Sequence, residues 1–163
     1  MSLVVCDASS LIFLAKVNRL ELVHAFAGDK LVVLPRTCDE VLSPRAGVAE
    51  ARRLADFLKK VKVVDFETGS FAGNQLSLSD RSLLVWALEN GASRILVDDL
   101  LLRRIARSEG LEVVGVLGLF MQAAHEGYLT KEEVLGDIET LINRDGMRIS
   151  LALYRRVLGL LRE

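Results

Sequence analysis

The chain has 163 residues, of which 51% are hydrophobic and 26% charged, and its formal net charge is −1. This length suits one domain with a substantial core, and the near-neutral charge argues against a strongly basic protein that binds nucleic acid without specificity. Because we recognise no run of about 18 apolar residues and no signal peptide at the amino terminus, we expect a cytoplasmic protein with no membrane contact.

The amino-terminal elements begin with a strand. Residues 3–6 form an apolar, β-branched run that stops at Asp7, which predicts a buried strand. The Ser9-Ser10 pair supplies N-cap side chains for a helix, and Gly28-Asp29 predicts a turn. Residues 31–34 then predict a second buried strand.

Strands and helices continue to alternate along the rest of the chain. Further strands are expected at residues 61–64, 94–97 and 112–114. Helices are expected at residues 35–43, 46–60, 77–90, 100–109, 130–143 and 150–162, and a loop at 67–76. Gly115 and Gly118 are expected to lead into one more helix. Alternating strands and helices predict right-handed crossovers and a mainly parallel sheet. We therefore predict an α/β fold, a three-layer α/β/α sandwich with about five strands, forming a single domain over residues 1–163 with residues 119–163 as a helical C-terminal extension.

Acidic residues stand at the boundaries of these predicted elements. Asp7 and the Asp98-Asp99 pair directly follow two strands, and parallel strands end at one edge of their sheet, where ligands usually bind. Asp80 begins a helix, and Glu40 lies one turn into another. If the strands before Asp7 and Asp98 are neighbours, these carboxylates converge on one cleft.

Such a cluster suits a hard divalent cation. Neighbouring carboxylates raise one another's pKa unless a cation offsets their charge, and Mg²⁺ or Mn²⁺ prefers oxygen ligands. A bound cation of this kind also supports phosphodiester hydrolysis. Each residue has an ordinary interpretation as well, because the Asp98-Asp99 pair and Asp80 could serve as helix caps, and Glu40 could be a solvated helix residue.

The same segments resemble those of PIN-domain nucleases, in particular the VapC-like toxins of prokaryotic toxin–antitoxin pairs. The resemblance lies in four segments, residues 4–12, 35–41, 78–80 and 96–99. Their order and spacing match those of the family over about residues 3–115. The glycines of residues 115–118 and the Arg-Ile-Ser of residues 148–150 resemble the tail of a PIN-like subgroup.

The resemblance implies a Mg²⁺- or Mn²⁺-dependent ribonuclease that acts on RNA. The acidic residues would bind the metal and be catalytic: Asp7, Glu40, Asp80 and Asp98 or Asp99. Ser9 would hydrogen-bond to a ligand or to a metal-bound water. Val97 departs from the Thr or Ser that many relatives carry two residues before the last aspartate, which leaves open whether Asp98 or Asp99 is the ligand. The resemblance also implies a homodimer and a small antitoxin protein as partner.

Arginines and cysteines complete the candidate residues. Four arginines near the acidic positions are candidates for RNA binding: Arg81, Arg103, Arg104 and Arg107. They could neutralise phosphates, or they could form a solvated helix face. Cys6 and Cys38 are expected to be reduced and largely buried.

Two other functions compete with the nuclease hypothesis. A catalytically silent PIN-like module would keep the fold to bind RNA or protein. An aspartyl phosphotransferase would need a second aspartate two residues after Asp7, where Ser9 stands, and a lysine near the later acids, whereas no lysine lies between Lys62 and Lys131.

Overall fold

The computed structural model describes residues 3–43, 47–66 and 76–163. Its centre is a five-stranded, all-parallel sheet with the order β3-β2-β1-β4-β5. The strands are β1 (Val4–Cys6), β2 (Leu31–Val33), β3 (Lys62–Val63), β4 (Arg94–Leu96) and β5 (Glu112–Val114). The predicted parallel α/β fold is confirmed, while most of the loop predicted over residues 67–76 lies outside the described residues.

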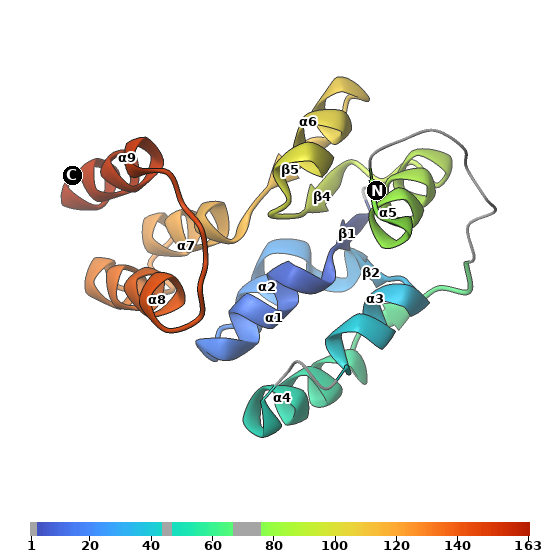
Figure 1. Ribbon diagram of the computed structural model, residues 1–163, viewed down its shortest axis with the longest axis horizontal. Helices are drawn as coiled ribbons and strands as arrows, with labels where there is room; N and C mark the ends of the chain where they lie inside the picture. Colours follow the sequence, from blue (N-terminus) through green and yellow to red (C-terminus); the bar gives the residue numbers. More distant parts are fainter. Residues whose placement is uncertain (1–2, 44–46, 67–75) are drawn as a thin grey trace.

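Helices connect the strands and extend beyond them (Figure 1). In the first half of the chain they are α1 (Ala8–Lys16), α2 (Glu21–Ala27), the short 3-10 helix η1 (Gly28–Lys30), α3 (Pro35–Val41) and α4 (Val48–Leu58). In the second half they are α5 (Leu78–Glu89), α6 (Leu100–Ser108), α7 (Val116–His125), α8 (Lys131–Asn143) and α9 (Leu151–Arg162). No helix in these described ranges has the length and apolar character needed to cross a membrane.

The structure corrects three local predictions. Asp7, and not the serines after it, is the N-cap of α1, because its side chain accepts a hydrogen bond from the backbone N–H of Ser10. The segment before Gly28 contains two helices, since Asn18 adopts a left-handed conformation (φ 56°) just after α1. Gly118, expected to precede a helix, lies inside α7.

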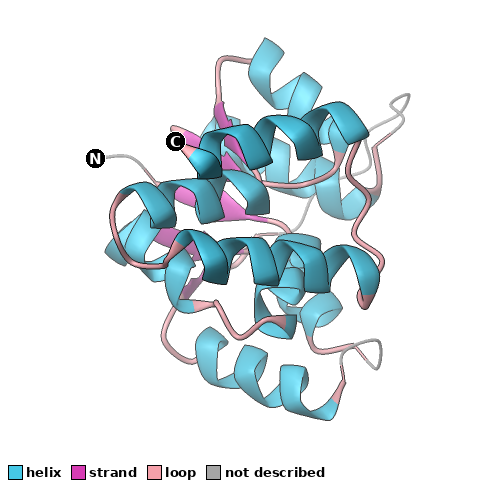
Figure 2. Ribbon diagram, turned by 90° about the vertical axis from the view of Figure 1, so that its left-hand side faces the viewer, coloured by secondary structure: helices cyan, strands magenta, loops and turns pink. Residues whose placement is uncertain are grey.

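Helices cover both faces of the sheet, which confirms the three-layer arrangement (Figure 2). Successive residues of a strand point to opposite faces, so Val4 and Cys6 enter one core, whereas Val5 enters the other. The first core is formed with α1, α2, α3, α4, α7, α8 and α9, and the second with α5 and α6. Most of the helices therefore pack on the first face of the sheet.

The C-terminal helices belong to the first core. Val134 and Ile138 of α8 and Val157 of α9 are buried in the same cluster as Leu11 and Leu14 of α1. Residues 119–163, predicted as an extension, therefore share a core with the sheet.

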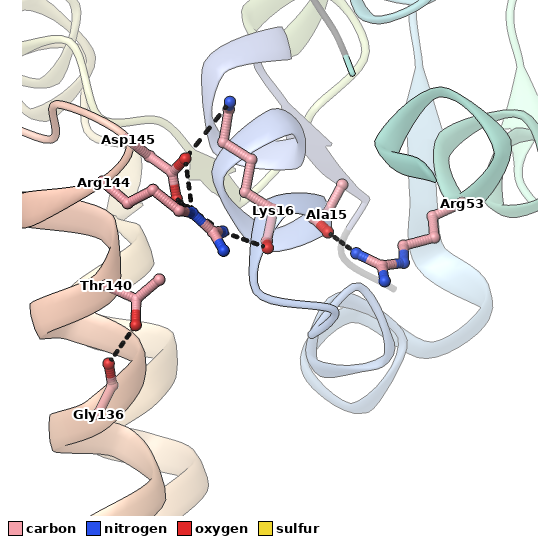
Figure 3. Close-up of polar contacts among 7 residues, drawn as sticks. All are labelled: Ala15, Lys16, Arg53, Gly136, Thr140, Arg144 and Asp145. Carbon is pink, nitrogen blue, oxygen red and sulfur yellow. Dashed lines mark hydrogen bonds and ion pairs between the residues drawn. The ribbon is translucent and has the colours of Figure 1, made fainter. Parts of the chain in front are cut away.

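Polar contacts also hold the end of α1 (Figure 3). Arg144 donates from Nη2 to the carbonyl oxygen of Lys16 (2.8 Å), and Arg53 of α4 donates from Nη1 to that of Ala15 (2.9 Å). The side chain of Asp145 is only 7% exposed and pairs with both Arg144 (3.0 Å) and Lys16 (3.6 Å). Cations at the C-terminal end of a helix also complement its dipole, so these contacts fix α1 between α4 and α8.

Candidate active site

The sheet brings the residues after β1 and β4 together. The two strands are neighbours, with Cys6 opposite Leu96, and both end at the same edge of the sheet. The chain moves from β1 to β2 and β3 on one side and to β4 and β5 on the other. Ligands of such sheets bind where the strand order reverses, and here that point lies between Asp7 and the Asp98-Asp99 pair.

A small pocket of about 120 Å³ opens at this point, and we call it the acidic pocket. Its lining residues are Asp7, Ala8, Ser9, Thr37, Glu40, Ser79, Asp80, Leu83 and Asp99. They come from α1, α3, α5 and the end of the β4 segment, so elements far apart in the sequence meet here. The structure thus brings together four of the five predicted acidic residues.

Asp7 is the most buried carboxylate of the acidic pocket, with 7% of the residue exposed. Its Oδ1 atom accepts from the backbone N–H of Ser10 (2.9 Å) and its Oδ2 atom from that of Asp98 (3.4 Å). The pKa of Asp7 is raised to about 7, mainly by burial and to a smaller extent by the charge of Asp98, while the hydrogen bonds from Ser10 and Asp98 oppose the rise. Asp7 is therefore a poorly solvated carboxylate that would gain from a nearby cation.

Asp98 and Asp99 point to different partners. Asp98 accepts from the backbone N–H of Val116 at the start of α7 (3.1 Å) and from the Ser10 hydroxyl (3.3 Å), and it is absent from the residues that line the acidic pocket. Asp99 lines this pocket and is the N-cap of α6, where Oδ1 accepts from the backbone N–H of Leu102 (2.8 Å). The geometry therefore favours Asp99 over Asp98 as the acidic residue of the pocket.

The opposite wall of the acidic pocket joins α3 to α5. The Ser79 hydroxyl donates to Oε1 of Glu40, which connects the two helices. Burial raises the pKa of Asp80, and the charges of Asp99 and Glu40 raise it further. Asp80 therefore interacts electrostatically with carboxylates from two other elements, as expected when acidic residues share one site.

Residues that the sequence analysis did not single out complete the pocket. The predicted hydrogen bonder, Ser9, is exposed and lines the acidic pocket, whereas the neighbouring Ser10 makes the hydrogen bonds to Asp7 and Asp98. Thr37 is buried and lies one turn before Glu40 on α3, and Ser79 directly precedes Asp80. The sequence feature that could have pointed to Ser10, Thr37 and Ser79 is their position close to a predicted acidic residue.

The four candidate arginines are dispersed. Arg103 lines a larger cavity next to the acidic pocket. Arg81 is partly buried on α5, and Arg104 and Arg107 are exposed on α6. Arg103 thus lies in a concave surface that adjoins the acidic residues.

The donor chemistry of the acidic pocket fits a hard divalent cation. All its polar side chains offer carboxylate or hydroxyl oxygens, which Mg²⁺ and Mn²⁺ prefer. The raised pKa values of Asp7 and Asp80 record unfavourable burial and repulsion, which a cation would relieve. In the arrangement described here, however, no three His, Cys, Asp or Glu side chains of residues 3–43, 47–66 and 76–163 are grouped so that they could hold one metal ion.

Comparison with known proteins assigns the chain to a family. The family model described as "DUF3368: PIN domain" matches residues 3–163. The chain is also similar to the solved structure of a PilT N-terminus domain protein from the hyperthermophilic archaeon Sulfolobus solfataricus P2, with 15% sequence identity, a TM-score of 0.49, and coverage of 72% of this chain and 89% of that chain. None of the curated proteins that were compared matches the chain.

Proposed function

The chain belongs to the PIN-domain family, a family of nucleases, and we propose that it is a Mg²⁺- or Mn²⁺-dependent endoribonuclease that hydrolyses RNA phosphodiester bonds. The observation that carries this proposal is the convergence of Asp7, Glu40, Asp80 and Asp99 on one pocket at the switch point of the sheet. These carboxylates would hold the cation, which when bound supplies an activated water and offsets charge on the phosphate.

The surrounding residues hold the carboxylates in place. Ser10 fixes the orientation of Asp7 through its backbone N–H and that of Asp98 through its hydroxyl. Ser79 does the same for Glu40. Partners of this kind orient ligands and tune their basicity, so we assign Ser10 and Ser79 as positioning residues.

The biological setting is part of the same proposal. We propose a VapC-like toxin whose activity a small antitoxin protein restrains, and which acts as a homodimer. This part rests on the resemblance of the acidic segments and of the tail. Induced expression should then arrest growth of a host cell that lacks the antitoxin, and the Asp80→Asn variant should not.

A catalytically silent binding module is the second candidate. It is favoured by the absence, in the described part of the chain, of a group of acidic side chains close enough to hold a metal ion. It is also favoured by the fact that Asp7 and Asp99 already serve as N-caps. A silent module would bind RNA or protein without cleavage.

RNA cleavage separates the two candidates. Purified protein would be incubated with labelled single-stranded RNA in Mn²⁺, in Mg²⁺ or in EDTA, and the products resolved on a denaturing gel. We expect metal-dependent cleavage that falls at least about 100-fold in Glu40→Gln and in Asp80→Asn, in line with the loss of metal-site residues.

The matched control is Glu132→Gln, which removes an exposed carboxylate from the first turn of α8, far from the acidic pocket in the sequence. It should cleave as the unaltered protein does. Cleavage that persists in EDTA, or that is equal in all variants, would contradict the proposal.

A further inference from the structure

A groove of about 700 Å³ lies beside the acidic pocket. Its walls come from α7 and α9, so we call it the α7–α9 groove. The remaining lining comes from α1, β5, the segment from Asp98 to the start of α6, and residues 146–148. Its volume falls within the roughly 300–1,000 Å³ of small-ligand sites. It is therefore large enough for a ligand that the smaller acidic pocket could not hold.

The groove carries positive charge from three separate segments. Arg103 lies on α6, Arg148 precedes α9 and Arg156 lies within α9, and all three line the groove. Arg148 and Arg156 are exposed and form no hydrogen bond or ion pair with the described residues. The Nε atom of Arg103 is buried without a hydrogen-bond partner among those residues. Arg103 offsets part of the charge of Asp98, whereas Arg148 and Arg156 present guanidinium groups without an ion-pair partner among the described residues. Free guanidinium groups bind phosphates well.

Apolar side chains lie between these arginines. Leu153 and Leu160 of α9 line the groove, yet they are 38% and 46% exposed, so the protein itself does not cover them. Phe13 of α1 and Met121 of α7 line it as well. Aromatic, apolar and guanidinium surfaces together are typical of sites that stack nucleobases and pair with their phosphates.

The α7–α9 groove and the acidic pocket adjoin each other. Ser9 and Asp99 line both of them. A chain molecule bound in the groove would therefore pass directly to the carboxylates of Asp7, Glu40 and Asp80. A small ligand would not need this connection, whereas a strand cut at the acidic pocket would.

We propose that the α7–α9 groove binds the unpaired nucleotides of RNA next to the phosphate that is cleaved in the acidic pocket. Arg103, Arg148 and Arg156 contact their phosphates, and the apolar residues hold the bases. Bases paired in an A-form duplex are stacked and cannot enter such a groove, so the substrate is single-stranded at this position. The inference rests on the proposed nuclease function and names the residues of this chain that would hold the RNA beside the acidic pocket.

Binding can be measured without cleavage. A fluorescein-labelled oligoribonucleotide of mixed sequence would be titrated with the full chain in EDTA, and anisotropy followed at several salt concentrations. The same titration would use an abasic oligomer of equal length and an RNA duplex. Arg156→Gln and Arg148→Gln remove charges of the groove, and Leu160→Ala removes apolar surface. The matched controls are Arg155→Gln and Leu151→Ala, which change exposed residues of the same helix that do not line the groove.

The expected pattern differs between variants. Arg156→Gln and Arg148→Gln should each weaken binding several-fold and reduce the slope of log K against log salt by about 0.7, the value for one phosphate contact with a single strand. The abasic oligomer should bind about tenfold more weakly than RNA if base contacts contribute. Leu160→Ala should weaken RNA binding but not binding of the abasic oligomer, and both controls should bind as the unaltered protein does.

Other outcomes overturn the inference. They are equal losses in Arg155→Gln and Arg156→Gln, an abasic oligomer or duplex that binds as tightly as single-stranded RNA, or no RNA binding at all. A dimer that becomes monomeric in Leu160→Ala would instead assign the groove to contact between two copies. If groove binding follows the expected pattern but metal-dependent cleavage is absent, the nuclease proposal fails, and the groove keeps only its role in binding single-stranded RNA. If cleavage occurs but the groove variants bind and cleave normally, the nuclease proposal stands and the groove inference fails.

Discussion

The Oδ2 atom of Asp7 accepts a hydrogen bond from the backbone N–H of Asp98 (3.4 Å), which links the residue after β1 directly to the residue after β4. Asp98 in turn accepts from the backbone N–H of Val116 and thereby holds the start of α7. These contacts explain why the two adjacent aspartates, Asp98 and Asp99, have different roles. Asp98 holds strands and helices together at the sheet edge, which leaves Asp99 to line the acidic pocket.

Replacing Asp80 by Asn should stabilise the metal-free protein. Burial raises the pKa of Asp80, and the charges of Asp99 and Glu40 raise it further, so its ionised form is unfavourable in the fold. Because the residue is only partly buried, we expect a gain of about 0.5–1 kcal/mol and a rise in Tm of about 1–4 °C. Scanning calorimetry in EDTA at neutral pH measures this.

The control for Asp80→Asn is again Glu132→Gln on α8, where loss of a first-turn carboxylate should leave Tm unchanged or lower it. Mn²⁺ should raise Tm more in the unaltered protein than in Asp80→Asn. A lower Tm in both variants and no effect of Mn²⁺ would show that Asp80 acts only through its helix.

The stability of the protein should fall as pH rises through the range in which Asp7 ionises. Burial raises the pKa of Asp7 from 3.8 to about 7, so between these values the folded protein binds a proton that the unfolded chain has released. The stabilising contribution is complete below the unfolded pKa and is lost as pH passes the folded one. For Asp7 alone this amounts to about 2–3 kcal/mol between about pH 5 and about pH 8.

Urea unfolding at these two pH values measures the loss, and Asp7→Asn supplies the comparison. The variant should show a smaller difference between the two pH values, whatever its absolute stability. An unchanged difference would contradict a raised pKa for Asp7.

Replacing Gly115 by Ala should destabilise the fold at the sheet edge. A Cβ atom at this position would lie 2.9 Å from Oδ1 of Asp98 and 3.1 Å from Nη1 of Arg103. The displacement of these groups should cost about 1–3 kcal/mol, as for other crowded sites. Gly136→Ala is the matched control, since nothing lies within 4 Å of its Cβ position inside α8, and it should stabilise by about 0.5–1 kcal/mol. A stabilising Gly115→Ala would disprove the close approach.

Replacing Asp145 by Asn should loosen the attachment of α1. The Asp145 side chain is only 7% exposed and is the counter-charge of Lys16 and Arg144. Loss of these charged contacts should lower the free energy of unfolding by about 1–3 kcal/mol in chemical denaturation. Asp29→Asn removes a carboxylate that is 88% exposed and also pairs with a lysine, and it should change stability by less than about 0.5 kcal/mol. Equal effects in both variants would refute a structural role for Asp145.

The two cysteines should react slowly with thiol reagents in the native protein. Burial raises the pKa of the Cys6 thiol and, less completely, that of Cys38, and the thiolate is the reactive form. In Cys38→Ser, the remaining Cys6 should be labelled by a chromogenic disulfide only on unfolding. Rapid labelling of that variant under native conditions would contradict the burial of Cys6.

The sequence predicts the order of strands and helices well because each strand is a short apolar run between clear stop signals. Residues 94–97 illustrate this, since they are expected as a strand that stops at the Asp98-Asp99 pair, and β4 occupies Arg94–Leu96. The choice between Asp98 and Asp99 could not be made, because it depends on the backbone N–H of Val116, a residue 18 positions away. The capping role of Asp7 was missed for a local reason, as the serines after it are equally good caps.

The α7–α9 groove could not be predicted either, since its lining depends on how α9 packs against α7. Arg148 and Arg156 lie far in the sequence from every acidic segment. Hydrophobic periodicity places them on or near a helix but does not say what that helix faces.

The core shared by α1 and the C-terminal helices affects how the protein matures during translation. Residues 7–99, which contain every acidic side chain of the pocket, leave the ribosome first. Leu11 and Leu14 of α1, the helix that follows Asp7, belong to the same buried cluster as Val134, Ile138 and Leu141, which are made later. A nascent chain that ends before α8 therefore carries all its carboxylates but lacks the support that orders them. The acidic pocket therefore gains the full support of this shared core only once residues 131–162 have emerged.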